Sequence, residues 1–216
     1  MTTAEPGPVP DRDVPPSALV LLAANAVPLA GVLFLHWTIF SVVLLYWCEN
    51  VVVGAVNVLK ILFAEPQSLG ANLGKIFLIP FFVVHYGMFT MIHGLFVLVL
   101  FGPHTGGGPS VAAFSLAIRQ AGIGLGVVAI AASHGYSFFQ NYLFAGEYRR
   151  MSPQVLMAQP YARVVVLHLT ILAGGFATAA LGAPMVALLV LVALKTAIDY
   201  RAHLSERRKL GAVTVA

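Results

Sequence analysis

The segment Tyr46-Trp47-Cys48-Glu49-Asn50 lies in the middle of an apolar run that extends from about Thr38 to Leu62. A helix that crosses a bilayer needs ~20 mostly apolar residues, so this run is long enough to span a membrane. A carboxylate at its centre is costly in hydrocarbon, by about 3 kcal/mol. We therefore expect other helices to surround Glu49 and Asn50 and to form a polar site with them inside the membrane.

The composition of the whole chain is typical of a membrane protein. Its 216 residues are 59% hydrophobic and only 9% charged, whereas soluble domains contain ~25% charged residues. The 12 Lys and Arg residues slightly outnumber the 8 Asp and Glu residues and form no basic tract, so we expect no nucleic-acid partner. The single cysteine, Cys48, excludes an internal disulfide and a cysteine-based zinc site.

Glycine, proline and charged residues divide the chain into six apolar runs, and a His36-Trp37 pair predicts a tight turn between the first two. The sequence therefore predicts an all-α fold, a polytopic transmembrane bundle of about six helices. The expected helices cover residues 17–35, 38–63, 73–101, 111–144, 161–181 and 185–203.

The expected transmembrane domain covers residues 18–204. The polar, proline-rich segment 1–17 predicts a disordered tail, and residues 205–216 predict a second tail. Lys and Arg residues gather in the loops on the side of the two tails, which predicts that both termini are cytoplasmic. Ser152 and Pro153 predict the start of a short interfacial helix before the fifth run.

Helical spacing places several polar residues on shared faces and at similar depth. Asn50, Gly54 and Asn57 share one face, and so do Tyr86, Thr90 and His93. At ~1.5 Å per residue, the polar groups of five helices fall between the midplane and the cytoplasmic surface, with His93 toward the outer side. Such groups face the interior of a bundle and pair with one another.

These positions give the candidate site. The candidate metal ligands are His85, His134 and His168, because imidazoles with a carboxylate and no thiolate suit Zn, Fe, Mn or Cu. The candidate catalytic residues are Glu49, Asp199 and Ser137. The supporting polar residues are Asn50, Asn57, His93, Asn141 and Lys195.

Each of these residues also has a structural interpretation. A lone histidine in a helix is usually a hydrogen-bonded packing residue, and asparagines often join helices. Lys195 and Asp199 fit a buried ion pair. Arg163, Tyr148 and Arg149 are interpreted as anchors at the membrane surface.

The motifs Trp47-x-Glu49-Asn50, His85-Tyr86-Gly87 and Ser133-His134-Gly135 resemble those of a bacterial integral membrane family of unknown function, over roughly residues 20–204. The resemblance implies the same architecture and a place in the bacterial inner membrane, and it implies no activity. In residue types alone, the candidate site is similar to the zinc site of intramembrane hydrolases such as alkaline ceramidases. The residues that correspond in type are His85, His134, His168, Asp199 and Ser137. This chain departs from those hydrolases because it has six expected helices instead of seven, and no pair of histidines four apart.

Three functions remain open at this point. The first is a metal-dependent membrane hydrolase acting on lipid, with Glu49 or Asp199 as the general base. The second is a protein that handles protons or ions through its buried charges. The third is b-type haem ligation by two histidines on facing helices. Membrane lipid is the expected partner, and the sequence does not indicate the oligomeric state.

Overall fold

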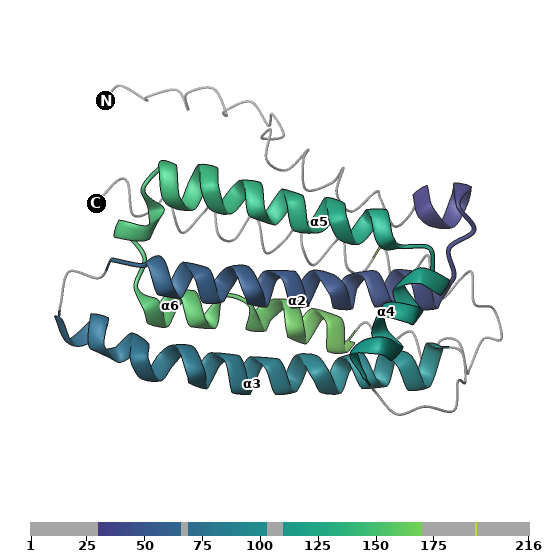
Figure 1. The fold of residues 1–216 in the computed structure, drawn as a ribbon, viewed down its shortest axis with the longest axis horizontal. Coiled ribbons are helices and arrows are strands. Elements are labelled where there is room, and N and C mark those ends of the chain that lie inside the picture. The colour runs from purple at the N-terminus through teal and green to yellow at the C-terminus, as the bar shows by residue number, and fades with distance from the viewer. Residues whose placement is uncertain (1–29, 66–68, 103–109, 170–192, 194–216) are drawn as a thin grey trace, which may run out of the picture.

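The computed structural model describes residues 30–65, 69–102 and 110–169, together with Ala193 (Figure 1). Within these residues the secondary structure is entirely helical, without a β-strand. The predicted all-α class is therefore confirmed. The predicted tails and most of the first and sixth helices lie outside the described residues, and the fifth helix is described only as far as Leu169.

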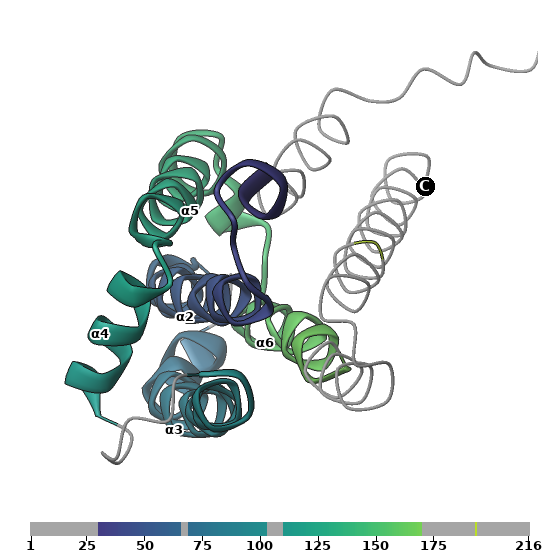
Figure 2. The ribbon, with the colours of Figure 1, turned by 90° about the vertical axis from the view of Figure 1, so that its right-hand side faces the viewer.

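Helix α2 (Ile39–Phe63) lies at the centre of the bundle, with α3, α5 and α6 around it (Figures 1 and 2). Its bounds match the predicted span. Thr38 caps its N-terminus by accepting a hydrogen bond from the backbone N–H of Ser41 at 3.2 Å. In its most apolar stretch 67% of the residues are buried, compared with 28% in α3, so α2 is the helix that the others enclose.

The predicted turn before α2 is confirmed. Residues 30–34 are helical, and the chain then reverses through His36, whose φ of 54° is in the left-handed region. The backbone N–H groups of Leu35 and Trp37 both donate to the carbonyl of Gly31, each at 3.0 Å. The indole of Trp37 folds back over Gly31, where a Cβ would lie only 2.2 Å from the ring.

Helix α3 (Leu69–Phe101) runs antiparallel to α2 and packs along it. Trp47 Nε1 donates to the carbonyl of Thr90 at 2.7 Å, and the Tyr86 hydroxyl donates to the carbonyl of Asn50 at 2.9 Å. Between the two helices, the Lys75 ammonium donates to the carbonyls of Leu62 and Ala64, which satisfies the C-terminal end of α2.

The predicted single helix over residues 111–144 is wrong. Helix α4 (Val111–Gln120) and helix α5 (Gly124–Ser137) are separated by a break, and the chain bends there by 109°. Gly122 sits in the break with φ of +67°, a conformation that glycine adopts without strain. Gly122 therefore makes the corner, whereas Gly126 in α5 lies close to α2, where a Cβ would stand 3.2 Å from Leu45 Cδ1.

After α5 the chain continues as a π-helix, η1 (Phe138–Phe144), and a 3₁₀ turn, η2 (Glu147–Arg149). Helix α6 (Pro153–Ala158) follows, with Ser152 as its N-cap, as predicted. Its Leu156 is fully buried, so this short helix packs into the bundle. Residues 161–169, here called the 161–169 helix, continue from α6 after a turn.

Helices α2 and α3 are each long and apolar enough to cross a membrane. The bent segment formed by α4 and residues 124–144 would add a third span if it crosses as one unit. The outward side chains of α3 are large and apolar, as expected for a helix at the lipid-facing side of a bundle. The described part of the chain is thus a helical bundle built around two helices of membrane-spanning length.

Candidate functional site

The polar face predicted on α2 is confirmed. Asn50, Gly54 and Asn57 are all buried between helices. Glu49 lies next to this face, and 19% of its side chain is exposed. The centre of α2 therefore presents a carboxylate and two amides to its neighbours, and none of the three side chains is fully exposed.

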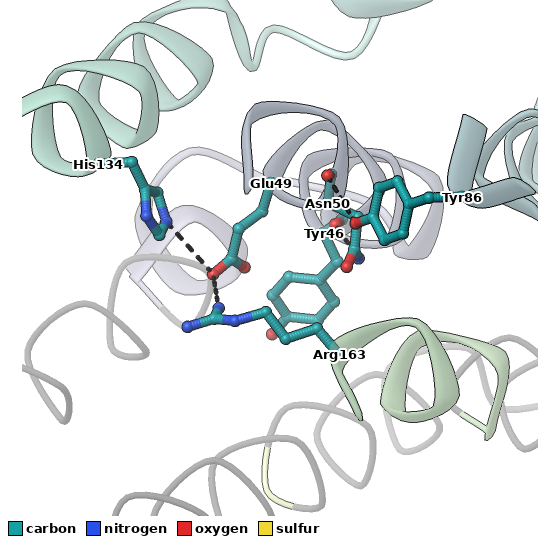
Figure 3. A network of polar contacts seen from close by, with 6 residues as sticks. All are labelled: Tyr46, Glu49, Asn50, Tyr86, His134 and Arg163. Carbon is teal, nitrogen blue, oxygen red and sulfur yellow. Dashed lines mark hydrogen bonds and ion pairs between the residues drawn. The ribbon is translucent and has the colours of Figure 1, made fainter. Parts of the chain in front are cut away.

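Glu49 lies between a histidine and an arginine from two other helices (Figure 3). Arg163 of the 161–169 helix donates from Nη1 to Glu49 Oε1 at 2.9 Å. His134 of α5 has its Nε2 4.0 Å from the same oxygen, which is too long for a hydrogen bond but close enough for an ion pair. One carboxylate oxygen thus meets a permanent cation and a titratable imidazole.

Asn50 points away from Glu49, toward α3 (Figure 3). Its side-chain Nδ2 donates to the backbone carbonyl of Tyr46 at 3.0 Å, and the backbone carbonyl of Asn50 accepts a hydrogen bond from the Tyr86 hydroxyl at 2.9 Å. Its side-chain Oδ1 is buried and accepts no hydrogen bond from the residues that the structure describes. Asn50 therefore supports the contact between α2 and α3 beside the carboxylate.

The segment from α6 to the 161–169 helix runs antiparallel to α2. Asn57 Nδ2 donates to the carbonyl of Leu156 at 2.9 Å, and Arg163 reaches Glu49 two turns earlier on α2. Leu156 and Arg163 are seven residues apart, and their partners on α2 are eight residues apart. Such nearly equal separations are expected for two helical segments packed side by side. Helix α6 therefore sets the position at which Arg163 meets Glu49.

A polar cavity of about 260 Å³ opens beside the ion pair. It lies between α2, α5 and the residues that follow α6. Both groups that contact Glu49 are among its lining residues. Its polar lining residues are Asn57, Lys60, His134, Gln159 and Arg163. The Lys60 ammonium lies 5.4 Å above the Tyr142 ring, so the π-helix η1 helps to position it.

The other predicted histidines form two separate pairs between α3 and the 161–169 helix. His85 Nδ1 shares a hydrogen bond with the hydroxyl of Tyr161 at 2.7 Å. His93 Nε2 shares one with His168 Nδ1 at 2.9 Å, and the Nδ1 of His93 contacts the carbonyl of Phe89 at 2.6 Å. The carbonyl can only accept, so His93 Nδ1 carries the proton.

The predicted metal ligands do not come together. His85 pairs with Tyr161, His134 faces Glu49, and His168 pairs with His93. Over the described ranges, no group of three His, Cys, Asp or Glu side chains could hold a metal ion. The depth expected for His168 was wrong, because this residue pairs with His93 and therefore lies level with it instead of with His85. Helix α6, which precedes this segment, packs inside the bundle.

A bis-histidine haem site does not fit these pairs either. The two axial imidazole nitrogens of a haem lie on opposite sides of the iron and stand about 4 Å apart, at ~2.0 Å for each bond. The nitrogens of His93 and His168 are 2.9 Å apart and directly hydrogen-bonded. This pair is therefore a hydrogen-bonded contact between α3 and the 161–169 helix.

The remaining predicted residues either lie away from Glu49 or belong to the part of the chain that the structure does not describe. Asn141 Nδ2 donates to Ser137 Oγ at 3.1 Å, one turn away within the same helical segment. Lys195 and Asp199 lie outside the described residues.

Sequence reasoning missed the role of Arg163, which was interpreted as a surface anchor. It also missed Tyr161, the partner of His85, and Gln159 in the cavity lining, neither of which stands out by spacing. A usable signal for Arg163 was the unbalanced charge of Glu49, because a carboxylate at the centre of an apolar helix requires a cation from another helix.

Comparison with known proteins gives a family and no activity. The sequence model of a family of unknown function (DUF6498) matches residues 9–215, which is nearly the whole chain. No curated protein and no solved structure matches. The predicted resemblance to a family of unknown function is confirmed, and similarity to alkaline ceramidases is not found.

Proposed function

The chain belongs to a family of unknown function, and from this premise we propose that it is a multi-pass membrane protein that binds and transfers protons at Glu49. The observation that carries the proposal is the position of this carboxylate. It lies at the centre of a helix of membrane-spanning length, between Arg163 at 2.9 Å and His134 at 4.0 Å. Ionisable groups inside membrane spans commonly mark proton relays and ion pathways.

Glu49, Arg163 and His134 have different roles in this proposal because their side chains differ in charge and in acidity. Arginine stays protonated, so Arg163 supplies a fixed positive charge that stabilises the carboxylate of Glu49. Histidine changes charge near neutral pH, so His134 can take a proton from water and release it again. The polar cavity, which His134 and Arg163 both line, has a volume of about 260 Å³ and is large enough to hold that water.

A proton can then pass between the imidazole and the carboxylate. The 4.0 Å between His134 Nε2 and Glu49 Oε1 must close to about 3 Å, or be bridged by one water molecule. Closing the gap directly would need a change of side-chain rotamer, and both side chains are partly exposed, His134 by 28% and Glu49 by 19%.

The location of the protein is part of the proposal. The charge asymmetry of the loops supports both termini in the cytoplasm of a bacterium, with the chain crossing the inner membrane about six times. In this orientation Lys60, which lies near the end of α2 and lines the cavity, is on the cytoplasmic side. We do not include a metal, because the three candidate histidines occupy three separate pairs.

Proton flux into liposomes tests the function. Full-length protein is reconstituted into vesicles that contain a pH-sensitive dye, and a potassium gradient with valinomycin sets the membrane potential. We expect wild-type protein to acidify the lumen and Glu49→Gln to reduce the flux to that of protein-free vesicles. The glutamine keeps the shape of the side chain and removes its titration.

The matched control is Glu65→Gln. Glu65 is also a glutamate paired with an arginine, but 66% of its side chain is exposed, and its partner Arg149 lies 3.6 Å away outside the cavity lining. This variant should retain the wild-type flux. A wild-type flux no greater than that of empty vesicles, or equal fluxes for Glu49→Gln and wild type, would refute the proposal.

A further inference from the structure

A second pair of titratable side chains lies between α3 and the 161–169 helix, apart from the site at Glu49. His93 is buried and His168 is exposed. Nε2 of His93 and Nδ1 of His168 are 2.9 Å apart, and the planes of the two rings are inclined by 81°. The proton transfer proposed for Glu49 does not use this pair, so its chemistry is open to a separate role.

The hydrogen bonds fix the positions of the protons in the neutral pair. The carbonyl of Phe89 only accepts, so His93 carries its proton on Nδ1 and leaves Nε2 with a lone pair. That lone pair accepts from His168, which therefore carries its own proton on Nδ1. The remaining nitrogen, Nε2 of His168, then has a lone pair, and among the described residues it has no hydrogen-bond partner.

We propose that the His93–His168 pair is a second proton-binding site, which holds one extra proton at a time on Nε2 of His168. Protonation at this atom keeps the bond between the rings, because Nδ1 of His168 still donates to Nε2 of His93. The donor is then a charged imidazolium, and charge-assisted hydrogen bonds are stronger than neutral ones. His168 is the exposed member of the pair, so the proton can enter while His93 stays buried.

The same geometry limits the pair to one extra proton. A second proton would have to occupy Nε2 of His93, which already faces the N–H of His168. Both nitrogens of the contact would then be donors without a lone pair between them, and the two rings would both be cationic. Binding of a second proton therefore requires the contact between α3 and the 161–169 helix to open.

Helix α3 holds His93 in the orientation that this site requires. Its Nδ1 contacts the carbonyl of Phe89, one turn earlier on the same helix, at 2.6 Å. The next residue, Gly94, packs its backbone against the Trp47 indole, where a Cβ would stand only 2.6 Å from the ring. Rotation of the imidazole by half a turn would remove both of its hydrogen bonds. The lone pair on Nε2 therefore stays directed at the 161–169 helix.

The proton capacity follows from this hydrogen-bond pattern and not from the net charge of the surroundings. In the part of the chain that the structure describes, His93 and His168 form hydrogen bonds only to Phe89 and to each other. The titratable and charged side chains on the neighbouring elements form none with either imidazole. These side chains are Tyr46 and Glu49 on α2, His85 and Tyr86 on α3, and Tyr161 and Arg163 on the 161–169 helix.

The pair lies farther along the bundle than Glu49. Arg163 meets Glu49, and His168 follows Arg163 by five residues, which corresponds to about 7.5 Å of helix. Helix α6 is at the other end of this segment, where Leu156 meets Asn57. The pair is therefore on the outer side of Glu49 in the proposed orientation. Its part in transport, as the site that a proton reaches after Glu49, rests on the proposed function.

Solid-state NMR tests the proton site, on full-length protein in lipid bilayers with a nitrogen isotope label in its histidines. Protonated and bare imidazole nitrogens give separate signals, and loss of a signal in His93→Gln or His168→Gln assigns it. At alkaline pH we expect both rings to carry their proton on Nδ1, with a nitrogen–nitrogen correlation between the two rings. On acidification, His168 should gain a proton on Nε2 while the correlation and the bare Nε2 of His93 persist. The correlation itself identifies the pair, so the test stands even where a variant does not fold.

Proton flux into liposomes tests the part of the pair in transport. His168→Gln removes the nitrogen that takes the proton, and its amide can still donate to Nε2 of His93. We expect this variant to lower the flux at least about tenfold, because a proton-carrying group is lost. The matched control is His36→Asn, since His36 is an exposed histidine in the turn before α2 and asparagine tolerates its φ of 54°. The control should retain the wild-type flux.

The outcomes separate this inference from the proposed function. A bare Nδ1 on either ring at alkaline pH, absence of the correlation, or two doubly protonated rings that keep the correlation overturns the proton site. A wild-type flux in His168→Gln overturns its part in transport. Wild-type protein without flux refutes the function of Glu49, and the titration of the pair then still decides whether it binds one proton.

Discussion

The backbone of Gly94 on α3 lies directly against the indole of Trp47 on α2. A Cβ at Gly94 would stand 2.6 Å from both Cε2 and Nε1 of that ring. The ring is held on two sides. Its Nε1 donates to the backbone carbonyl of Thr90 at 2.7 Å, and its face stacks on the ring of Phe114, with the two ring centroids 4.4 Å apart. This contact fixes how closely α2 and α3 approach each other.

Gly94→Ala should therefore destabilise the protein by about 1 to 3 kcal/mol, as overpacking of a core does. The matched control is Gly87→Ala on the same helix, where a Cβ would meet nothing within 4 Å. There the better helix propensity of alanine should leave stability unchanged or raise it by up to ~1 kcal/mol. Unfolding free energies in mixed micelles measure both, and equal values for the two variants would contradict the contact.

A second prediction concerns the hydroxyl of Tyr86. It donates to the carbonyl of Asn50 at 2.9 Å in a buried position between α2 and α3. Tyr86→Phe should cost about 1 kcal/mol of unfolding free energy, the usual net value of such a bond. Tyr136→Phe, at a position that is 68% exposed, should cost nothing measurable. A Tyr86 variant as stable as the Tyr136 variant would show that the bond makes no net contribution.

The corner between α4 and α5 gives a third prediction. Gly122 and Gly124 both have open space where a Cβ would be, but only Gly122 has a positive φ, of +67°. Gly122→Ala should therefore cost about 1 to 2 kcal/mol through backbone strain alone. Gly124→Ala should be neutral or slightly stabilising. The same unfolding assay compares them, and a costly Gly124 variant beside a neutral Gly122 variant would place the corner elsewhere.

The orientation of the chain gives a fourth prediction. Reporter fusions after Gly107 and at the C-terminus should give opposite signals, with alkaline phosphatase active only at Gly107 and a cytoplasmic fluorescent reporter bright only at the C-terminus. The physical reason is the excess of Lys and Arg in the loops that share a side with the termini. A C-terminal alkaline phosphatase fusion that is active would contradict the assigned orientation.

Local patterns in the sequence predicted the all-α class and the helix around Glu49. The span around Glu49 was predicted at residues 38–63 and is observed at Ile39–Phe63. The turn at His36 and the cap at Ser152 were also predicted. These features depend on neighbouring residues, so hydropathy, proline and capping chemistry are sufficient to place them.

The break at Gly122 and the partners of the histidines could not be predicted in this way. Glycine fits both a close helix contact and a corner, and its sequence context does not distinguish the two. The depth of His168 was estimated from the supposed start of the fifth helix at the membrane surface. The burial of α6, with Leu156 fully enclosed, depends on contacts with residues about 100 positions away and leaves no periodic signal.

The pairing of Glu49 with Arg163 has a consequence for how the protein is made. The two residues are 114 positions apart, so at ~5–20 residues per second the ribosome adds Arg163 roughly 6–23 s after Glu49. In the proposed membrane topology, helix α2 enters the bilayer during that interval without its later cation. A carboxyl group that is protonated during insertion and loses its proton when Arg163 arrives avoids the cost of a lone buried charge. Biogenesis would then use the same protonation step that we propose for the folded protein.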